Sequence, residues 1–380
     1  MPPVVQDTMP VTPAVISWAR DRAGYSLQEA TKYFKGIEAW ENGQSSPSYS
    51  QLELMSEKFK CPVAVFFFPA PPDLEPAKQS FRTLTDQDYS SIPRTVKTLL
   101  RKAQAMQLNL AELNDQRNPA QKIITKELEL AVNASLVDMA RRVRDYLGVS
   151  LEQQSQWPSA EIALEAWRDA FTRAGIFVFK DAFHVEGYFG FCLFDNEFPI
   201  VYVNNSAAKS RQIFTLFHEL AHLLFHTSGI DVLDDSFVEH LPDNSKKIEI
   251  ICNRFAAAFL VPDIAFNAQL RTLPANRDTA TFLANYYKVS REVIYRKMLN
   301  RRLISENEYS EAVRAWAADA RPSAPGGNYY FTQFTYLGSQ YIDLAFSRYH
   351  QRRFDESQLA EYLNIKPKSL AAFEQLYGRE

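Results

Sequence analysis

Residues 211–226, RQIFTLFHELAHLLFH, constrain this chain more than any other stretch of its sequence. Three of the chain's six histidines fall here, at positions 218, 222 and 226, within an otherwise largely apolar run. Because four residues make about one turn of α-helix, His218 and His222 share one face of a helix at this spacing. Two imidazole groups placed in this way can bind one metal ion. The segment therefore predicts a buried helix that carries a metal site.

The residues HELAH match the His-Glu-x-x-His pattern of zinc peptidases. Neutral imidazole binds Zn²⁺ well, and a catalytic zinc keeps one position open for water beside three protein ligands. Bound zinc lowers the pKa of that water to about 7. Glu219 lies next to the ligand face, where its carboxylate can accept the proton as a general base. The alternative interpretation is a core helix that happens to contain histidines.

A third zinc ligand must come from another element, and IEIICNRFAAAFLVP at 248–262 offers the best candidate. Its core residues recur at helical spacing: Ile248, Cys252, Phe255 and Phe259. Glu249 lies beside this apolar stripe, where an ionised group is costly without a partner. Small alanines on the same face allow close approach to the HELAH helix. We therefore expect Glu249 to complete a zinc site with His218 and His222; the alternative is an exposed glutamate favoured by the helix dipole.

His226 competes for the same role. Eight residues span about 12 Å of helix, so His226 cannot bind the ion of His218 unless the helix ends first. We expect it to interact with the helix C-terminus or to line the cleft. The residue that stabilises the oxyanion is not identified by the sequence, and the candidates are Tyr202, His226 and His240.

The rest of the chain predicts a mainly α protein with a small antiparallel sheet, an α+β fold. Residues 13–60 and 86–150 show helical periodicity. Between residues 176 and 205, the runs IFVFK, YFGFCLF and PIVYVNN are short, β-branched and aromatic, which predicts the sheet. Asn205 or Ser206 is expected to cap the HELAH helix.

Composition restricts the class of protein. A hydrophobic content of 46% and an aromatic content of 13% over 380 residues indicate ordered domains. The net charge of −3 gives no overall attraction to nucleic acid or to anionic membranes. Three scattered cysteines indicate a reducing compartment, and the first residues, MPPVVQDTMP, do not resemble a signal peptide. We expect a cytoplasmic protein without a membrane partner.

The segment RQIFTLFHELAHLLFH, followed by ExxxNRFAAAFLVP, resembles the ImmA/IrrE family of bacterial and phage metallopeptidases. The resemblance implies a zincin-like metallopeptidase core flanked by helical modules. It also implies Zn²⁺ ligands at His218, His222 and Glu249, with Glu219 as the catalytic glutamate. Looser similarities to the long, two-part members of the family lie at FRTL (81–84), GFCLFDNEFPIVYVN (190–204) and VSREVIYRKMLNRRLIS (289–305).

The N-terminal segments VISWARDRAGYSL and AWENGQSSPSYSQLELMSEKFKCPVAVFFFP resemble the Xre-type helix-turn-helix module that often precedes such peptidases. The interval 31–39 between them is about four residues shorter than a standard helix-turn-helix needs. Residues 1–70 carry six Lys/Arg against seven Asp/Glu, whereas a DNA-binding module normally shows a basic face. We interpret the module as degenerate. One alternative is that it has only a structural or protein-interaction role, and the other is that it still binds DNA.

The predicted domains are the degenerate helix-turn-helix-like module (1–72), a helical linker (73–150), the zinc metallopeptidase domain (151–275) and a C-terminal helical region (276–380). The predicted function is a zinc-dependent endopeptidase acting on a protein, which the resemblance implies to be a repressor-type regulator. A strand at 188–195 or 198–204 is expected to pair with an extended peptide. The alternative is an antitoxin or transcriptional regulator that uses the peptidase fold mainly to bind a cognate toxin or DNA.

Overall fold

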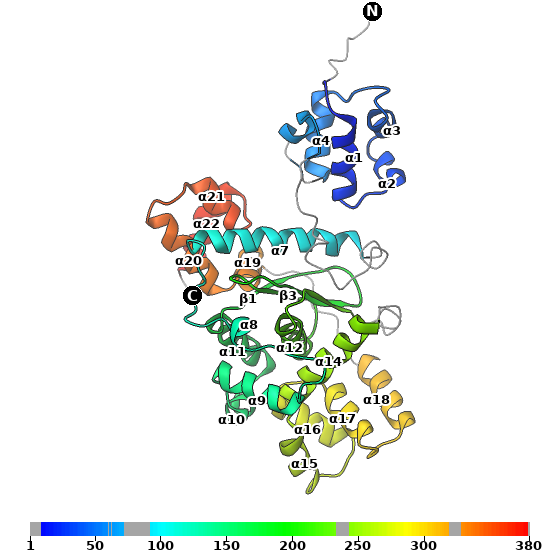
Figure 1. The fold of residues 1–380 in the computed structure, drawn as a ribbon, viewed down its shortest axis with the longest axis vertical. Helices are drawn as coiled ribbons and strands as arrows, with labels where there is room; N and C mark the ends of the chain where they lie inside the picture. Colours follow the sequence, from blue (N-terminus) through cyan, green and yellow to red (C-terminus); the bar gives the residue numbers. More distant parts are fainter. Residues whose placement is uncertain are drawn as a thin grey trace, which may run out of the picture. The chain divides into compact units, whose positions relative to one another are not determined.

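A computed structural model describes residues 9–59, 61, 63–71, 92–232, 243–318 and 328–378 (Figure 1). The described residues form two compact units, one extending to Lys102 and the other beginning at Ala103. The four-part division drawn from the sequence stays a prediction, because these two units divide the chain more coarsely. The FRTL segment at 81–84 and His240 lie outside the described residues.

The first unit is a small helical module with its own hydrophobic core. Its elements are α1 (Pro13–Arg22), α2 (Leu27–Thr31), α3 (Ile37–Glu41), α4 (Tyr49–Phe59), the 3-10 helix η1 (Val63–Phe67) and the start of α7 (Arg94–Leu113). Ser26 and Glu29 cap α2 reciprocally, each side chain bonding the other's backbone N–H. The helices α2 and α3 have only five residues each, in keeping with the short 31–39 interval. A helix-turn-helix role for this unit stays a prediction.

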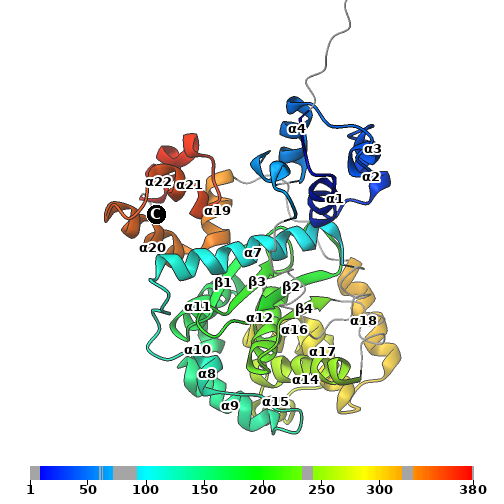
Figure 2. The same ribbon diagram turned by 45° about the horizontal axis from the view of Figure 1, so that its top comes forward.

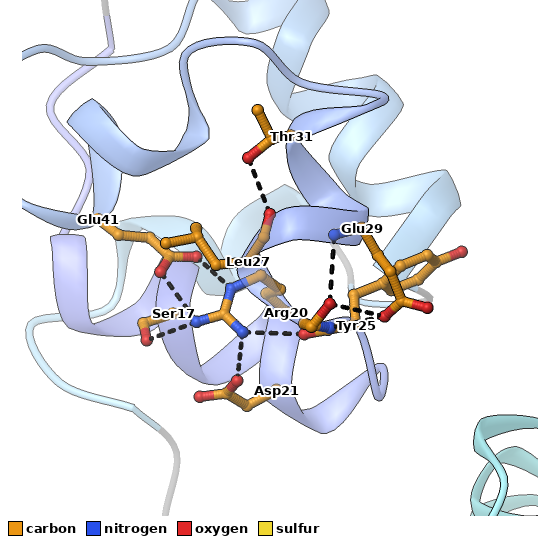
Figure 3. Close-up of polar contacts among 9 residues, drawn as sticks. Ser17, Arg20, Asp21, Tyr25, Leu27, Glu29, Thr31 and Glu41 are labelled. Atoms are coloured by element: carbon orange, nitrogen blue, oxygen red, sulfur yellow. Dashed lines mark hydrogen bonds and ion pairs between the residues drawn. The ribbon is translucent and has the colours of Figure 1, made fainter.

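Arg20 ties α1 to α3 in the interior of this unit (Figure 3). Its Nε donates to Glu41 Oε1 at 2.6 Å and its Nη2 to Glu41 Oε2 at 2.9 Å. Its Nη1 donates to the carbonyl oxygen of Tyr25 at 2.8 Å and also contacts Asp21. Both side chains of the Arg20–Glu41 pair are only 10% exposed, so each needs the other as a counter-charge. The carboxylate of Glu41 is therefore engaged inside the unit.

A four-stranded mixed sheet of order β1-β3-β2-β4 lies in the second unit. Strand β1 (Phe177–Asp181) is parallel to β3 (Ile200–Asn204). Strand β2 (Tyr188–Leu193) is antiparallel both to β3 and to β4 (Gly229–Val232). The antiparallel prediction is right for β2 and β3 and wrong for β1. The chain reverses once between β1 and β2 and again between β2 and β3, so β1 runs in the same direction as the strand it pairs with.

Different helices cover the two faces of this sheet (Figure 2). Helices α11 (Ala160–Arg173) and α12 (Lys209–Leu224) lie on one face, and the second-unit part of α7 crosses the other. Gln107 of α7 donates its amide to the carbonyl oxygens of Leu193 and Phe198, at 3.2 and 3.0 Å. Because side chains alternate along a strand, each strand supplies residues to both layers.

The remaining elements are helical: α8 (Ile124–Glu127), α9 (Leu136–Leu147), α10 (Leu151–Gln156), α14 (Asp243–Leu260), α15 (Asp263–Leu270), α16 (Arg277–Tyr287), α17 (Arg291–Asn300), α18 (Glu306–Ala318), α19 (Tyr329–Leu337), α20 (Ser339–His350), α21 (Glu356–Tyr362), η2 (Pro367–Ser369) and α22 (Leu370–Tyr377). The predicted class, mainly α with a small sheet, is confirmed. None of the described helices is long and apolar enough to cross a membrane.

Candidate metal centre

The helix that carries the histidines, α12, begins later than predicted. Lys209 is its first residue and Ala208 its N-cap, so neither Asn205 nor Ser206 caps it. Gln212 instead donates its side-chain amide to the carbonyl oxygens of Asn205 and Ala207, at 3.3 and 2.7 Å. This amide fixes the preceding turn, and the helix starts two or three residues later than predicted. Every residue of α12 from Gln212 to Leu224 is buried.

Helix α14 lies beside α12 and brings the predicted third ligand to it. Cys252, Phe255 and Phe259 are fully buried along the predicted stripe, and Ala256 between them is also fully buried. The ring of Phe259 stacks on Phe217 of α12 with centroids 4.1 Å apart. Small and flat side chains at this contact let the two helix axes approach closely.

His218, His222 and Glu249 converge at this contact. The two Nε2 atoms are 3.1 Å apart, and Glu249 places Oε2 3.3 Å from His218 Nε2 and Oε1 3.1 Å from His222 Nε2. Two ligands of a tetrahedral zinc, each about 2.0–2.1 Å from the ion, are about 3.3–3.4 Å apart. The three donor groups thus have the chemistry and nearly the separations of ligands that share one zinc ion.

The charges of these groups favour a bound cation. Both histidines are almost completely buried, and the Glu249 side chain is 13% exposed. Burial opposes ionisation of Glu249, but the two imidazoles outweigh it and hold the pKa of that carboxyl well below its usual range. Burial likewise opposes protonation of His218, but the carboxylates of Asp231 and Glu249 raise its pKa to about 9. The site therefore stabilises positive charge at the point where the three groups meet.

Neighbouring groups orient the two imidazoles. Asn253, one turn after Glu249 on α14, places Oδ1 3.1 Å from His218 Nδ1. Since the amide oxygen can only accept, Nδ1 donates to it, which leaves Nε2 as the ring nitrogen directed at Glu249. Gly229 packs against the His222 ring so tightly that a Cβ there would lie 2.4 Å from Cγ. Both rings are held with Nε2 toward Glu249.

Glu219 lies between the two histidines in sequence and has no exposed surface. Neither of its carboxylate oxygens accepts a hydrogen bond from an N–H or O–H donor within the part of the chain that the structure describes, and the buried thiol of Cys192 is its polar neighbour. Burial raises its pKa to about 7, although the neighbouring histidines oppose that shift. A buried carboxylate without a partner is costly, and such groups are found where chemistry requires them. Glu219 is therefore a candidate for a proton-transfer role at this site.

Two of the oxyanion candidates are placed away from the ligands. His226 follows α12 with φ 54°, donates from Nε2 to the carbonyl oxygen of Thr125 at 2.9 Å, and packs on Phe194. Tyr202 stacks on Phe191, in register with it, whereas the neighbouring Cys192 packs in the core with α12. Tyr202 therefore points to the face opposite α12, and its prediction as an oxyanion donor is wrong. Both faces of a buried strand are apolar, so its sequence does not show which side chains point toward α12 and which point away from it.

The strand order also corrects the prediction about peptide pairing. Strands β2 and β3 are both interior, since β3 lies between β1 and β2, and β2 between β3 and β4. The four-residue β4 was not expected from the sequence, and it covers the side of β2 that would otherwise be free. In the described sheet, β1 and β4 are the two edge strands, and Gly229 of β4 packs on the ring of the candidate ligand His222.

Sequence reasoning also missed Asp231, a buried carboxylate of β4. Its Oδ1 accepts from Arg211 Nη2 and its Oδ2 from Thr215 Oγ1, both at 2.7 Å. One available signal was the spacing of Arg211 and Thr215, which precede His218 on the same face of α12. No local pattern pointed to their partner in β4.

Comparison with known proteins agrees with this geometry. Residues 171–299 match the Peptidase_M78 family, described as an IrrE N-terminal-like domain. The matched stretch contains the sheet, α12, α14 and all of the candidate metal ligands. A peptidase-family domain is therefore present in the second unit.

One solved structure, titled "Mycobacterium tuberculosis transcriptional regulator", is similar with 21% sequence identity and a TM-score of 0.30. The similarity covers 43% of this chain and 46% of that chain, so the chain spans less than half of that protein's length. No curated protein matches the chain.

Proposed function

We propose that this protein is a zinc-dependent endopeptidase of the ImmA/IrrE type that cleaves a regulatory protein. One observation carries the proposal: His218, His222 and Glu249 converge beside the unpartnered carboxylate of Glu219. The match of this segment to a peptidase family supports it. A repressor-type regulator as the substrate belongs to the same proposal and comes from the family resemblance. The proposed cytoplasmic location comes from the few scattered cysteines and the first residues of the sequence.

Each residue has a distinct role in this proposal. His218, His222 and Glu249 hold the zinc ion, and Asn253 orients His218. A bound zinc ion supplies Lewis-acid chemistry, polarising the scissile carbonyl and lowering the pKa of water. Glu219 accepts the proton of the attacking water and delivers it to the leaving amine.

The substrate is expected to bind in an extended form along β4. In the described sheet this strand pairs on one side only, with β2, and it lies against α12 and His222. A peptide that adds to the other side of β4 would form main-chain hydrogen bonds beside the metal centre. A flexible segment of a protein can adopt this conformation, whereas a folded helix cannot.

The test is proteolysis by the zinc-loaded protein, with labelled casein and with a cell lysate whose new N-termini are then identified. Cleavage should occur, stop with a chelator and return with added zinc. The Glu219→Gln variant is the matched control, because it keeps the size of the side chain and leaves the ligands in place. Identical products from wild type and Glu219→Gln would reveal a contaminating protease, and absence of zinc-dependent cleavage from both substrates would refute the proposal.

A second candidate function is an antitoxin or transcriptional regulator that binds a cognate toxin or DNA. The presence of a separate compact unit with its own core, upstream of the peptidase-family domain, favours it. The two candidates differ in what Glu219→Gln does in cells lacking the native protein. Failure of this variant to complement at matched protein levels indicates proteolysis, and full complementation indicates a binding role.

A further inference from the structure

One face of α12 serves two purposes. Arg211, Thr215, His218 and His222 follow one another at intervals of four, three and four residues. At 3.6 residues per turn these positions form one row along the helix. The last two are the candidate zinc ligands, and the first two bind Asp231 of β4.

The contacts of Asp231 are specific. The residue is 3% exposed, so its charge requires compensation within the protein. Each oxygen has one partner at 2.7 Å, the Arg211 guanidinium on Oδ1 and the Thr215 hydroxyl on Oδ2. The guanidinium lies 4.0 Å from the ring centroid of Phe189, which restricts its position further. The three polar groups thus connect β4 directly to α12, with Asp231 and Thr215 buried and Arg211 partly exposed.

The backbone around this connection is built for close approach. Gly190 lies opposite Asp231 in the β2–β4 register, and a Cβ at Gly190 would be 2.4 Å from Thr215 Cγ2. Two residues before Asp231, and on the same side of β4, Gly229 rests on the His222 ring. Both ends of this four-residue strand are therefore held against the helix that carries the metal ligands.

A four-residue strand at the edge of a sheet opens easily unless other contacts hold it. A peptide that adds to such an edge gains binding energy only if the edge already has the correct position. We infer that Asp231, Arg211 and Thr215 are a positioning cluster that holds β4 at a fixed distance from the metal centre, so that an extended peptide bound to β4 reaches it. This inference rests on the proposed function.

The test separates binding at the metal from binding along β4. Acetohydroxamate binds a zinc ion alone, whereas a tri-alanine hydroxamate binds zinc and also extends a peptide along the strand. Calorimetry on the zinc-loaded full chain gives both affinities for wild type, Asp231→Asn and Thr215→Val. Thr215→Ser keeps the hydroxyl, and Asp115→Asn removes a carboxylate from exposed ion pairs with Arg348 and Arg353.

We expect the tripeptide hydroxamate to bind wild type more tightly than acetohydroxamate does. Asp231→Asn and Thr215→Val should each reduce the ratio of the two affinities by about tenfold, which is the effect of losing one buried hydrogen bond. Affinity for acetohydroxamate and zinc content should stay unchanged in Thr215→Val, and both control variants should behave as wild type. Asp231→Asn also removes a charge that acts on His218, so its two hydroxamate affinities are compared at equal zinc loading. Amide hydrogen exchange at residues 229–232 should become faster in the two test variants only.

Three results would overturn the inference. The first is that wild type binds the tripeptide hydroxamate no more tightly than acetohydroxamate, and the second is that the test variants lose affinity for both hydroxamates equally. The third is that amide hydrogen exchange at residues 229–232 is unchanged in both test variants. Equal loss would assign the cluster to the metal centre itself. If Asp231→Asn does not fold, the Thr215→Val and Thr215→Ser pair decides. Because these measurements need no turnover, a protein that cleaves neither casein nor lysate proteins can still show the β4 effect, and the two proposals can fail separately.

Discussion

At the scale of single residues, the candidate site depends on groups that are costly to bury and that compensate one another. His218, His222 and Glu249 each supply a donor atom to one point, and the nearest of these atoms are 3.1 to 3.3 Å apart. Glu219 lies beside them without a partner among the described residues. Three buried donor groups that converge on one point are typical of a metal site, and packing alone explains them poorly.

The first prediction concerns metal content. The purified protein should contain about one zinc per chain, because His218, His222 and Glu249 converge on one point and no thiol is among these donors. His222→Ala and Glu249→Ala should each lose the zinc, since two remaining ligands bind far more weakly. Elemental analysis after dialysis measures this, with Asp115→Asn as the control. Zinc retained by both alanine variants would show that the ligands are assigned wrongly.

The second prediction concerns Glu219. In Glu219→Gln, zinc content and melting temperature should change little, because the residue is not a ligand and the amide has the same shape. Turnover should fall by about 10²–10⁴-fold, the usual contribution of a general base. The rate of casein cleavage at equal zinc content measures this. A variant that keeps more than half of the wild-type rate would exclude Glu219 as the base.

At the scale of elements, the distance between α12 and the sheet depends on the absence of side chains at two glycines. Gly190 faces Thr215 of α12, and Gly229 faces His222. These contacts place the edge strand directly beside the ligand helix. The backbone conformation of β2 and β4 does not require glycine at these positions. Glycine is needed there because the side chains of α12 pack against the strands.

The third prediction tests this contact. In Gly190→Ala the new Cβ would lie 2.4 Å from Thr215 Cγ2 and 2.8 Å from the carbonyl oxygen of Tyr202, so backbone must move. We expect a loss of about 1–3 kcal/mol in the free energy of unfolding, the usual cost of overpacking. Gly378→Ala is the control, since its Cβ would meet its nearest neighbour at an ordinary 3.5 Å. Denaturant unfolding of both variants measures the difference, and equal stabilities would contradict the close approach.

At the scale of the whole molecule, the chain combines a peptidase-family domain with a separate helical unit. In that unit the short segment α2–α3 carries Glu29, Glu38 and Glu41 against Lys32 and Lys35, a net charge of −1. Glu41 is already paired with Arg20. A surface of this kind lacks the basic face that DNA binding normally requires.

The fourth prediction follows from this charge balance. The full chain should bind duplex DNA at most weakly, without sequence preference, and less as salt increases. A gel shift with a random-sequence duplex at low and at physiological salt measures this. Sequence-specific binding at nanomolar concentration in physiological salt would contradict the prediction and favour the regulator as the protein's function.

The sequence by itself determined the local features. Helical spacing grouped His218 with His222, placed Glu219 beside them and indicated that Glu249 needed a partner. Aromatic and β-branched runs indicated three of the four strands, and the mainly α class with a small sheet is confirmed. These features could be predicted because periodicity follows from the geometry of one backbone segment, which a short window of residues contains completely.

Only the tertiary structure decided which segments meet. It paired β1 in parallel with β3, added the unpredicted β4 at the edge, and turned Tyr202 away from α12. It also let Gln212 fix the turn before α12, which moved the start of that helix, and it supplied Asp231 as the partner of Arg211 and Thr215. Each of these outcomes depends on contacts between residues from different elements, whose free energy comes from burial and complementary charge that no single segment possesses.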